Sequence, residues 1–236
     1  MELKKRWQYH ETPERVQPDH VLAVAFDCEM GTAFDGDGEL IRLSLVDYFT
    51  GNTLIDSLVY PDVEMKHFNT KWSGVTRGQM ERARKQKKCL MGIEAARSAI
   101  FKYVGPKTIV MGHGMSNDFI CLRWYHDRLI DSHDIESGIR KEAERKEERQ
   151  RRRQAKAEGV PWSESKVEED KPALGKGHPD GTSLKALALR RLGRRIQQGK
   201  GHDSLEDAVA ARDLIHSYIV EWKPELGVIK GDLSTL

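Results

Sequence analysis

Two carboxylates lie at the end of an apolar segment near the start of the chain. Asp27 and Glu29 lie at the end of the run VLAVAFDCEM (residues 21–30), which has the composition of a buried central strand. Because side chains alternate across a strand, residues two apart point to the same face. Carboxylates held so close repel each other and resist desolvation, and a divalent cation between them relieves both effects. The pair indicates a metal site, but a strand end that reaches solvent would carry the same residues.

Asp118 is a third candidate ligand. It belongs to GHGMSNDF (residues 112–119), which follows a predicted strand and opens a predicted helix. Its carboxylate therefore falls in or near the first helical turn, where an acid is often no more than a partner of the helix dipole. Its value for chemistry lies in its expected position beside the same sheet edge as Asp27 and Glu29.

His202 and Asp207 complete the set. Both lie in GHDSLEDA (residues 201–208), where Ser204 and Asp207 resemble a capping box and predict that a helix begins. His202 would then precede this helix, and Asp207 would lie one turn inside it. A fixed carboxylate beside an imidazole suits a metal-activated water and its general base, whereas His202 alone would be an ordinary loop histidine.

The segments AFDCEM, GHGMSNDF and GHDSLEDA resemble the three exonuclease motifs of the DEDDh family. A histidine five residues before Asp207 is typical of the h branch, since the other branch has a tyrosine four residues before it, where Asp203 stands. The segments WSGVT (72–76), DS (131–132) and TSLKAL (182–187) are similar to Rex-type RNA exonucleases and the interferon-stimulated exonuclease. GHGMSNDF is also similar to the exonuclease domain of poly(A) deadenylases.

This resemblance, which covers roughly residues 21–135 and 182–220, implies a fold and a reaction. The fold is α/β and ribonuclease H-like, with a mixed five-stranded sheet flanked by helices. Two Mg²⁺ or Mn²⁺ ions, about 3.5–4 Å apart in such sites, would flank the scissile phosphate. The implied reaction is 3′→5′ hydrolysis of single-stranded RNA to nucleoside 5′-monophosphates. The resemblance assigns catalysis to Asp27, Glu29, Asp118, His202 and Asp207, of which the four acids would hold the metal ions.

Four further residues are candidates for substrate contact. Met30 and Phe119, each next to one of the acids, could form apolar walls for the terminal nucleotide, although core packing explains them equally well. Arg194 and Arg195 belong to a basic cluster before His202 and could line the path of the nucleic-acid backbone. A solvated helix face is the alternative for the arginines.

Other patterns predict the elements that must position these residues. Three strand-like segments, beginning with residues 21–30, predict an antiparallel meander, and Ser116 is expected to cap a helix that runs through Trp124. The other predicted strands are Leu40–Tyr48, Thr53–Tyr60 and Thr108–Met111, and the other predicted helices are Ile93–Val104, Thr182–Leu192 and Ser204–Val220.

The predicted organisation has three parts. An N-terminal extension covers residues 1–20, an exonuclease domain residues 21–220, and a tail residues 221–236. The domain is interrupted at about 138–181 by a charged insertion, helical or disordered, which has good helix formers but no apolar stripe. Nine basic and five acidic residues between 140 and 158 favour an RNA or an acidic protein as a partner of this insertion.

Composition narrows the class of protein without identifying a substrate. Three cysteines without a CxxC pair argue against a disulfide framework, and no apolar segment is long enough for a signal peptide or a membrane span. We therefore expect a soluble intracellular protein, with nucleus or nucleolus favoured and cytoplasm as the alternative. A DNA exonuclease or a poly(A) deadenylase would share the catalytic residues. A non-catalytic nucleic-acid-binding scaffold would not need so many clustered carboxylates.

Overall fold

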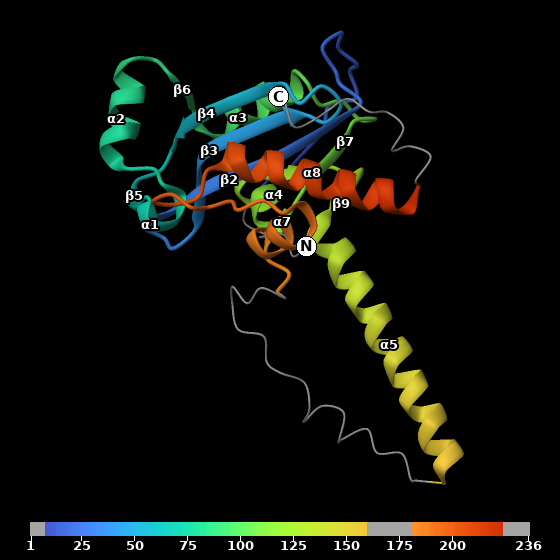
Figure 1. The fold of residues 1–236 in the computed structure, drawn as a ribbon. Helices are drawn as coiled ribbons and strands as arrows, with labels where there is room; N and C mark the ends of the chain where they lie inside the picture. The colour runs from blue at the N-terminus through green and yellow to red at the C-terminus, as the bar shows by residue number, and fades with distance from the viewer. Residues whose placement is uncertain (1–7, 160–180, 224–236) are drawn as a thin grey trace.

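A mixed β-sheet forms the centre of the computed structural model, which describes residues 8–159 and 181–223 (Figure 1). The strand order is β6-β4-β3-β2-β7-β9, and a further short strand, β5, pairs with β2. The α/β fold class is confirmed, but the sheet has seven strands rather than five because short strands extend it. The strands are β2 (Ala23–Ala33), β3 (Gly38–Asp47), β4 (Thr53–Tyr60), β5 (Met65–His67), β6 (Cys89–Met91), β7 (Ile109–Gly112) and β9 (Leu129–Asp131).

Strand β2 is central to the sheet. It pairs antiparallel with β3 and parallel with β7, so the predicted meander of β2, β3 and β4 is confirmed. The register places Asp27 opposite Ser44 and shifts between Glu29 and Met30, where a β-bulge changes the pairing. A bulge bends its strand locally and re-aims the side chains next to it.

Helices cover both faces of the sheet. Phe26, Leu43 and Leu45 face a core shared with α3 and α4, whereas Ala23 and Ala25 face Ile215 of α8. Because Asp27 alternates with Phe26, it faces the α8 side of the sheet. The helices are α1 (Thr70–Ser73), α2 (Arg77–Lys85), α3 (Gly92–Phe101), α4 (Ser116–Leu122), α5 (Ser132–Glu158), α7 (Leu184–Leu192) and α8 (Ser204–Trp222).

Two predicted helix starts have different capping residues in the structure. Ser116 is the first residue of α4, whose N-cap is Met115 without a side-chain hydrogen bond, and Trp124 lies beyond the helix. Helix α8 begins at Ser204 as predicted, but the capping residue is Asp203, whose carboxylate accepts from the backbone N–H groups of Leu205 and Glu206. Ser204 instead shares a buried hydrogen bond of 2.8 Å with the Ser44 hydroxyl, so the predicted capping box is wrong.

The described part of the N-terminal segment packs against the domain. Strand β1 (His10–Glu11) pairs in parallel with β8 (Trp124–Tyr125). The Trp124 indole N–H donates to the Thr12 hydroxyl over 2.9 Å. Residues 1–7, which belong to the predicted extension, lie outside the described residues.

The remaining predicted boundaries fall partly within the described residues. Helix α5 accounts for the first part of the charged insertion, and residues 160–180 lie outside the description. Helix α8 continues to Trp222, two residues into the predicted tail. Residues 224–236 of that tail lie outside the described residues. In the described ranges, no helix is both long and apolar enough to cross a membrane.

Candidate active site

All five predicted catalytic residues line one pocket of about 290 Å³. Asp27 and Glu29 come from β2, Asp118 from the first turn of α4, His202 from the loop before α8, and Asp207 from α8 itself. These segments are far apart in the sequence and meet because α4 follows β7, the parallel neighbour of β2, while α8 packs across β2 from the other side. Their neighbours around the pocket are Cys28, Met30, Asn69, Trp72, Ser73, Gly114 and Asn117.

Strand β9 ends in a residue that fixes one wall of this pocket. The Asp131 carboxylate accepts hydrogen bonds from the backbone N–H groups of Gly114 and Met115, over 2.8 and 2.9 Å. The same carboxylate caps α5 by accepting from the His133 N–H. Asp131 therefore holds the loop that leads into α4 and ties the start of α5 to the pocket.

Burial and neighbouring negative charges raise the pKa of all four carboxyl groups. Burial, followed by the charges of Asp118, Asp207 and Glu29, raises the pKa of Asp27 well above its ordinary value. Burial is also the largest cause for the other three, raising the pKa of Glu29 to about 8, of Asp118 to about 7 and of Asp207 to about 6. Such a group of acids favours protons or cations between its members.

These acids fit divalent cations by chemistry, although they do not surround a single point. The Oε1 atom of Glu29 is buried and has no hydrogen-bond partner among the described residues. Over the same residues, no three His, Cys, Asp or Glu side chains converge closely enough to hold one metal ion as they stand. Oxygen donors spread around an open pocket suit ions that keep water or phosphate oxygens as further ligands, as Mg²⁺ does.

His202 stands beside Asp207 at the rim of the pocket. Its Nδ1 atom lies 3.7 Å from Oδ2 of Asp207, and its side chain is 41% exposed. The ring meets the Trp72 indole edge-on at 6.3 Å, and the His202 backbone N–H donates to the Trp72 carbonyl. The imidazole can therefore reach both the carboxylate and a solvent molecule in the pocket.

A close contact between two glycines holds the loop that carries His202. Gly201 has a φ of +116°, and a Cβ added there would lie 2.5 Å from the backbone nitrogen of Gly74. Gly74 itself ends α1 with a φ of +66°. The segment WSGVT thus forms the platform on which the loop before α8 rests.

Comparison with known proteins shows that this chain is similar to several nucleases. No family model matches the chain. It is 31% identical over 212 residues to human apoptosis-enhancing nuclease, covering 86% of this chain and 51% of that protein. It is 29% identical over 215 residues to RNA exonuclease 3 of Saccharomyces cerevisiae, covering 91% of this chain and 41% of that protein. The chain is homologous to the DEDDh-type exonucleases.

The solved structures agree at the level of the fold. This chain superposes on the Pan2 catalytic unit of Neurospora crassa (protease and nuclease domain) with a TM-score of 0.58 at 19% identity. The match covers 95% of this chain and 32% of that chain. This chain spans about half the length of apoptosis-enhancing nuclease and less than half the length of yeast RNA exonuclease 3.

The structure also adds a residue that the sequence did not indicate. The Gln197 side-chain amide donates to both carboxylate oxygens of Asp207, over 3.2 and 3.0 Å. The backbone of Gln197 has a φ of +56°, and its N–H donates to the Glu206 carboxylate. A glutamine in a basic loop carries no signal by type or spacing, so only the fold reveals this contact.

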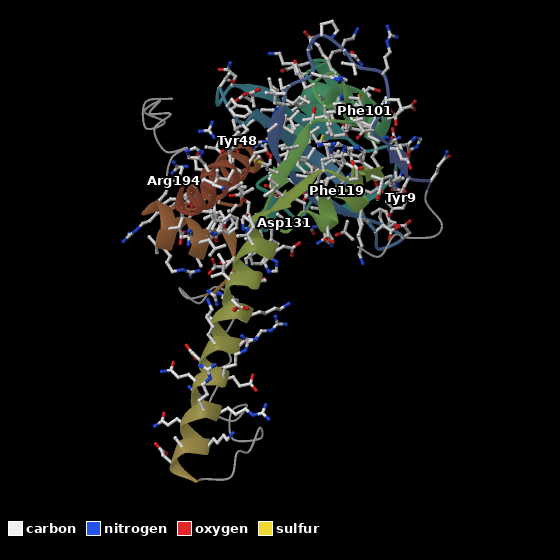
Figure 2. All side chains as sticks on the ribbon, turned by 90° about the vertical axis from the view of Figure 1, so that its right-hand side faces the viewer. Tyr9, Tyr48, Phe101, Phe119, Asp131 and Arg194 are labelled. Carbon is white, nitrogen blue, oxygen red and sulfur yellow. The ribbon has the colours of Figure 1, made fainter. Side chains whose placement is uncertain are left out.

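The four residues predicted to contact substrate have different surroundings. Met30 lines the pocket. Phe119 is 2% exposed and packs against Phe26 and Trp124 in the core, so its predicted role as a pocket wall is wrong. Arg194, at the periphery in Figure 2, pairs with Asp213 over 2.7 Å. Arg195 is exposed and, like Arg194, does not line the pocket of the acids.

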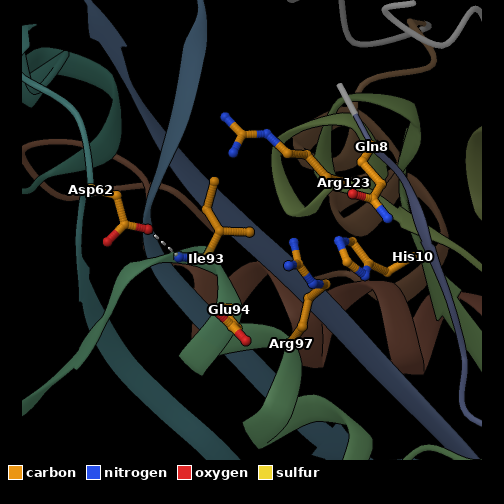
Figure 3. A pocket seen from close by; sticks show the side chains of 7 residues that line it. All are labelled: Gln8, His10, Asp62, Ile93, Glu94, Arg97 and Arg123. Carbon is orange, nitrogen blue, oxygen red and sulfur yellow. Dashed lines mark hydrogen bonds between the residues drawn. The ribbon is translucent and has the colours of Figure 1, made fainter. Parts of the chain in front are cut away.

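Two other hollows contain none of the four acids of the candidate site. One of about 370 Å³ lies beneath the N-terminal segment, where Arg97 and Arg123 share the space with Asp62 and Glu94 (Figure 3). Another of about 750 Å³ adjoins the pocket of the acids and shares His202 with it. The cations Arg42, Lys88 and Lys200 line it, and Arg42 is paired with Asp56 over 2.9 Å and with Asp203 over 3.2 Å.

Proposed function

We propose that this chain is a metal-dependent 3′→5′ exoribonuclease, which hydrolyses single-stranded RNA from its 3′ end to nucleoside 5′-monophosphates. The observation that carries the proposal is the meeting of four acids and one histidine, drawn from distant parts of the sequence, in a single pocket. Relatives named RNA exonuclease 3 support RNA as the substrate. A non-catalytic scaffold is disfavoured because clustered carboxylates without cations would repel phosphates.

Asp27, Glu29, Asp118 and Asp207 would hold the metal, which we propose to be two Mg²⁺ or Mn²⁺ ions. Their raised pKa values support this assignment, since cations stabilise the ionised form of acids that otherwise retain protons. When bound, such ions neutralise phosphate charge and lower the pKa of a coordinated water.

His202 would accept the proton of the attacking water. Its exposure and its position 3.7 Å from the Asp207 carboxylate support this role, because a base must reach the water and remain oriented. Met30 and the exposed Trp72 ring would flank the terminal nucleotide, for which apolar and aromatic surfaces suit stacking.

The assignment is tested by replacing single acids and by changing the nucleic acid. Asp27→Asn, Asp118→Asn and Asp207→Asn should each reduce turnover at least about 10³-fold, since each removes charge stabilisation worth several kcal/mol. The measurement is release of mononucleotides from matched RNA and DNA oligonucleotides in Mg²⁺, in Mn²⁺ and in EDTA. Near wild-type turnover in these variants contradicts the assignment of the acids, and equal cleavage of DNA contradicts the preference for RNA.

The place of action in the cell is a separate proposal. We propose the nucleus or nucleolus, which is supported by the basic run RQRRRQAK at residues 149–156. A fluorescent fusion of the chain should concentrate there. Cytoplasmic fluorescence of the wild-type fusion contradicts this proposal.

A further inference from the structure

Helix α5 projects away from the domain and leaves most of its length in solvent (Figure 1). From Lys141 to Glu158 every residue except Ala155 is exposed. Figure 2 shows side chains standing out from both sides of this helix. A helix that is polar on all sides contributes nothing to a core, so this part of α5 has another use or none.

One face of the projecting helix is basic. At about 100° per residue, the five residues Lys141, Arg145, Arg149, Arg152 and Lys156 fall within an arc of roughly 80° and extend over roughly 22 Å. The glutamates of this stretch all lie outside that arc. Within the described ranges, none of these five side chains forms an ion pair with a carboxylate. We call these five residues the basic stripe.

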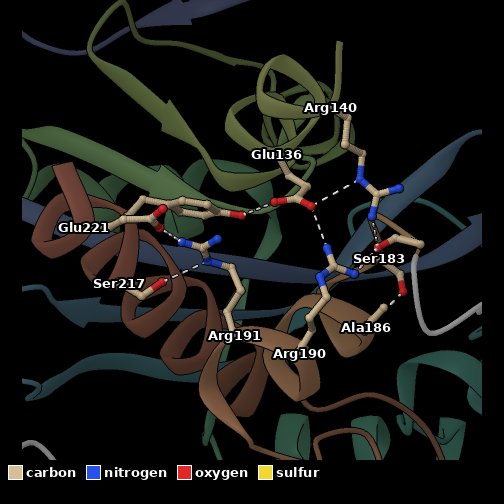
Figure 4. Close-up of polar contacts among 10 residues, drawn as sticks. Glu136, Arg140, Ser183, Ala186, Arg190, Arg191, Ser217 and Glu221 are labelled. Atoms are coloured by element: carbon tan, nitrogen blue, oxygen red, sulfur yellow. Dashed lines mark hydrogen bonds and ion pairs between the residues drawn. The ribbon is translucent and has the colours of Figure 1, made fainter. Parts of the chain in front are cut away.

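The base of the helix is fixed by a buried carboxylate (Figure 4). Glu136 accepts from Arg140 Nε over 3.2 Å, from Arg190 Nη2 over 2.5 Å and from the Tyr218 hydroxyl over 2.7 Å. These partners lie on α5, α7 and α8. Burial raises the pKa of Glu136, but the Tyr218 hydroxyl and the two guanidinium groups together hold it below its ordinary value. The ionised carboxylate therefore fixes the direction in which α5 leaves the domain.

The basic stripe begins close to the pocket of the acids. Asp131 links the first turn of α5 to Gly114, which lines that pocket. Lys141 lies nine positions after Ser132 along the helix, a rise of roughly 14 Å. An RNA whose 3′ end lies in the pocket and leaves on the Gly114 side would thus have its upstream phosphates within reach of the stripe.

We propose that the basic stripe of α5 binds the phosphate backbone of RNA upstream of the 3′ end, so that the helix holds long substrates at the pocket. The proposal rests on the proposed function for the identity of the substrate, and on charge complementarity for the contact. A span of roughly 22 Å is long enough to meet several consecutive phosphates. The hollow beside the pocket is less favourable for phosphates, because Asp56, Asp203 and Glu206 line it together with its cations Arg42, Lys88 and Lys200.

The test compares three variants of the full chain with the wild type. The stripe variant carries Lys141→Gln, Arg145→Gln, Arg149→Gln, Arg152→Gln and Lys156→Gln, which keep good helix formers. A matched control changes Glu144, Glu147, Glu148 and Glu158 of the same helix to Gln. A charge-conserving form exchanges Lys and Arg within the stripe. Circular dichroism should give the same helix content for all of them.

Binding and turnover are measured separately. Kd is determined by fluorescence anisotropy in EDTA, over a range of salt concentrations, for single-stranded RNAs of roughly 24 and roughly 4 nucleotides, bracketing common binding-site sizes. The stripe variant should bind the longer RNA at least about tenfold more weakly, with a salt slope reduced by up to about 3.5. Its kcat/KM on the short RNA in Mg²⁺ should equal that of the wild type, and the charge-conserving form should bind like the wild type.

Several outcomes would overturn the proposal. Unchanged affinity and salt slope for the longer RNA would do so, and this is also the result expected if the stripe serves a protein partner. An equal loss of turnover on the short RNA would mean that the substitutions act on the pocket. Stripe-dependent binding by a wild-type chain that cleaves neither RNA would contradict the proposed function alone.

Discussion

At the scale of single residues, the contact between Gln197 and Asp207 is the least expected part of the site. Both carboxylate oxygens accept from one amide, and this hydrogen bond opposes the burial that raises the pKa of Asp207 to about 6. Gln197 thereby favours the ionised carboxylate that a cation requires. It acts through Asp207 and is a positioning residue.

Replacement of Gln197 should change the pH profile of the reaction. Gln197→Ala removes the hydrogen bond and raises the pKa of Asp207 further, so protons compete with metal up to higher pH. We expect roughly a tenfold loss of kcat/KM near pH 6.5 and a smaller loss near pH 8.5, in the range typical of groups that support a ligand. The measurement is a pH–rate profile at constant Mg²⁺.

The matched control for this prediction is Gln198→Ala in the same loop. Gln198 is exposed and donates to the Ile196 carbonyl rather than to an acid of the pocket. It should retain the wild-type profile. If Gln197→Ala loses the same factor at every pH, its role is structural and does not involve the ionisation of Asp207.

At the scale of elements, the position of His202 depends on how its loop rests on the end of α1. Gly201 and Gly74 approach so closely that neither tolerates a side chain without a shift of the backbone. Gly201→Ala should therefore strain the loop by about 1–3 kcal/mol and displace the imidazole. A displacement of this kind should lower kcat about 10–100-fold, as measured with saturating RNA.

Gly199→Ala is the control for the loop. A Cβ there would meet nothing closer than the Gly201 carbonyl at 3.9 Å, and its backbone is not left-handed. Activity and Tm should stay near the wild-type values. Wild-type kcat in Gly201→Ala would show that the contact between α1 and the loop does not position His202.

The elements also show what the sequence could predict. The alternation of Phe26 with Asp27 and the spacing of Ile93 and Ile100 reflect burial on one face, and these elements are found where they were predicted. The cap of α8 was misassigned because Asp203, Ser204 and Asp207 are all good capping residues, and only the packing of Ser44 decides between them. Strands of three residues such as β5 and β6 carry too little periodicity to be detected.

The candidate site also has residues that the sequence could predict and residues that it could not. Asp27, Glu29, Asp118, His202 and Asp207 were predictable because each stands in a motif with recognisable spacing. Phe119 was not, since a residue next to an acid can face either the pocket or the core. Its ring faces the core, where Phe26 and Trp124 surround it.

At the scale of the whole molecule, the four acids should make stability depend on pH and metal together. A carboxyl with a raised pKa in the folded state stabilises the fold below its unfolded pKa, and this stability is lost as pH rises through the folded value. The folded values are about 8 for Glu29, 7 for Asp118 and 6 for Asp207. In EDTA, stability should therefore fall from about pH 4, where these acids ionise in the unfolded chain, up to about pH 8, the folded value of Glu29.

Metal should reverse this dependence, because cations bind the ionised acids of the folded state. Each kcal/mol lost corresponds to roughly 2–4 °C in Tm for a chain of this size, so we expect a fall of several degrees in EDTA. In millimolar Mg²⁺ the curve should be flat or rising. Thermal denaturation across this pH range is the measurement, with Glu29→Gln in EDTA as a control that should reduce the slope. Parallel curves with and without metal contradict a shared site.

The packing of α8 across β2 has a further consequence for the order in which the chain becomes active. Asp27 and Glu29 are synthesised early, Asp118 midway, and His202 and Asp207 only when α8 is reached. Until then, Ala23, Ala25 and Met111 lack the helix that buries them. Under the proposed function, a growing chain on the ribosome therefore lacks His202 and Asp207 and should not cut the RNA around it. Of the described helices, α8 is the last in the sequence, and it brings Asp207 to the site.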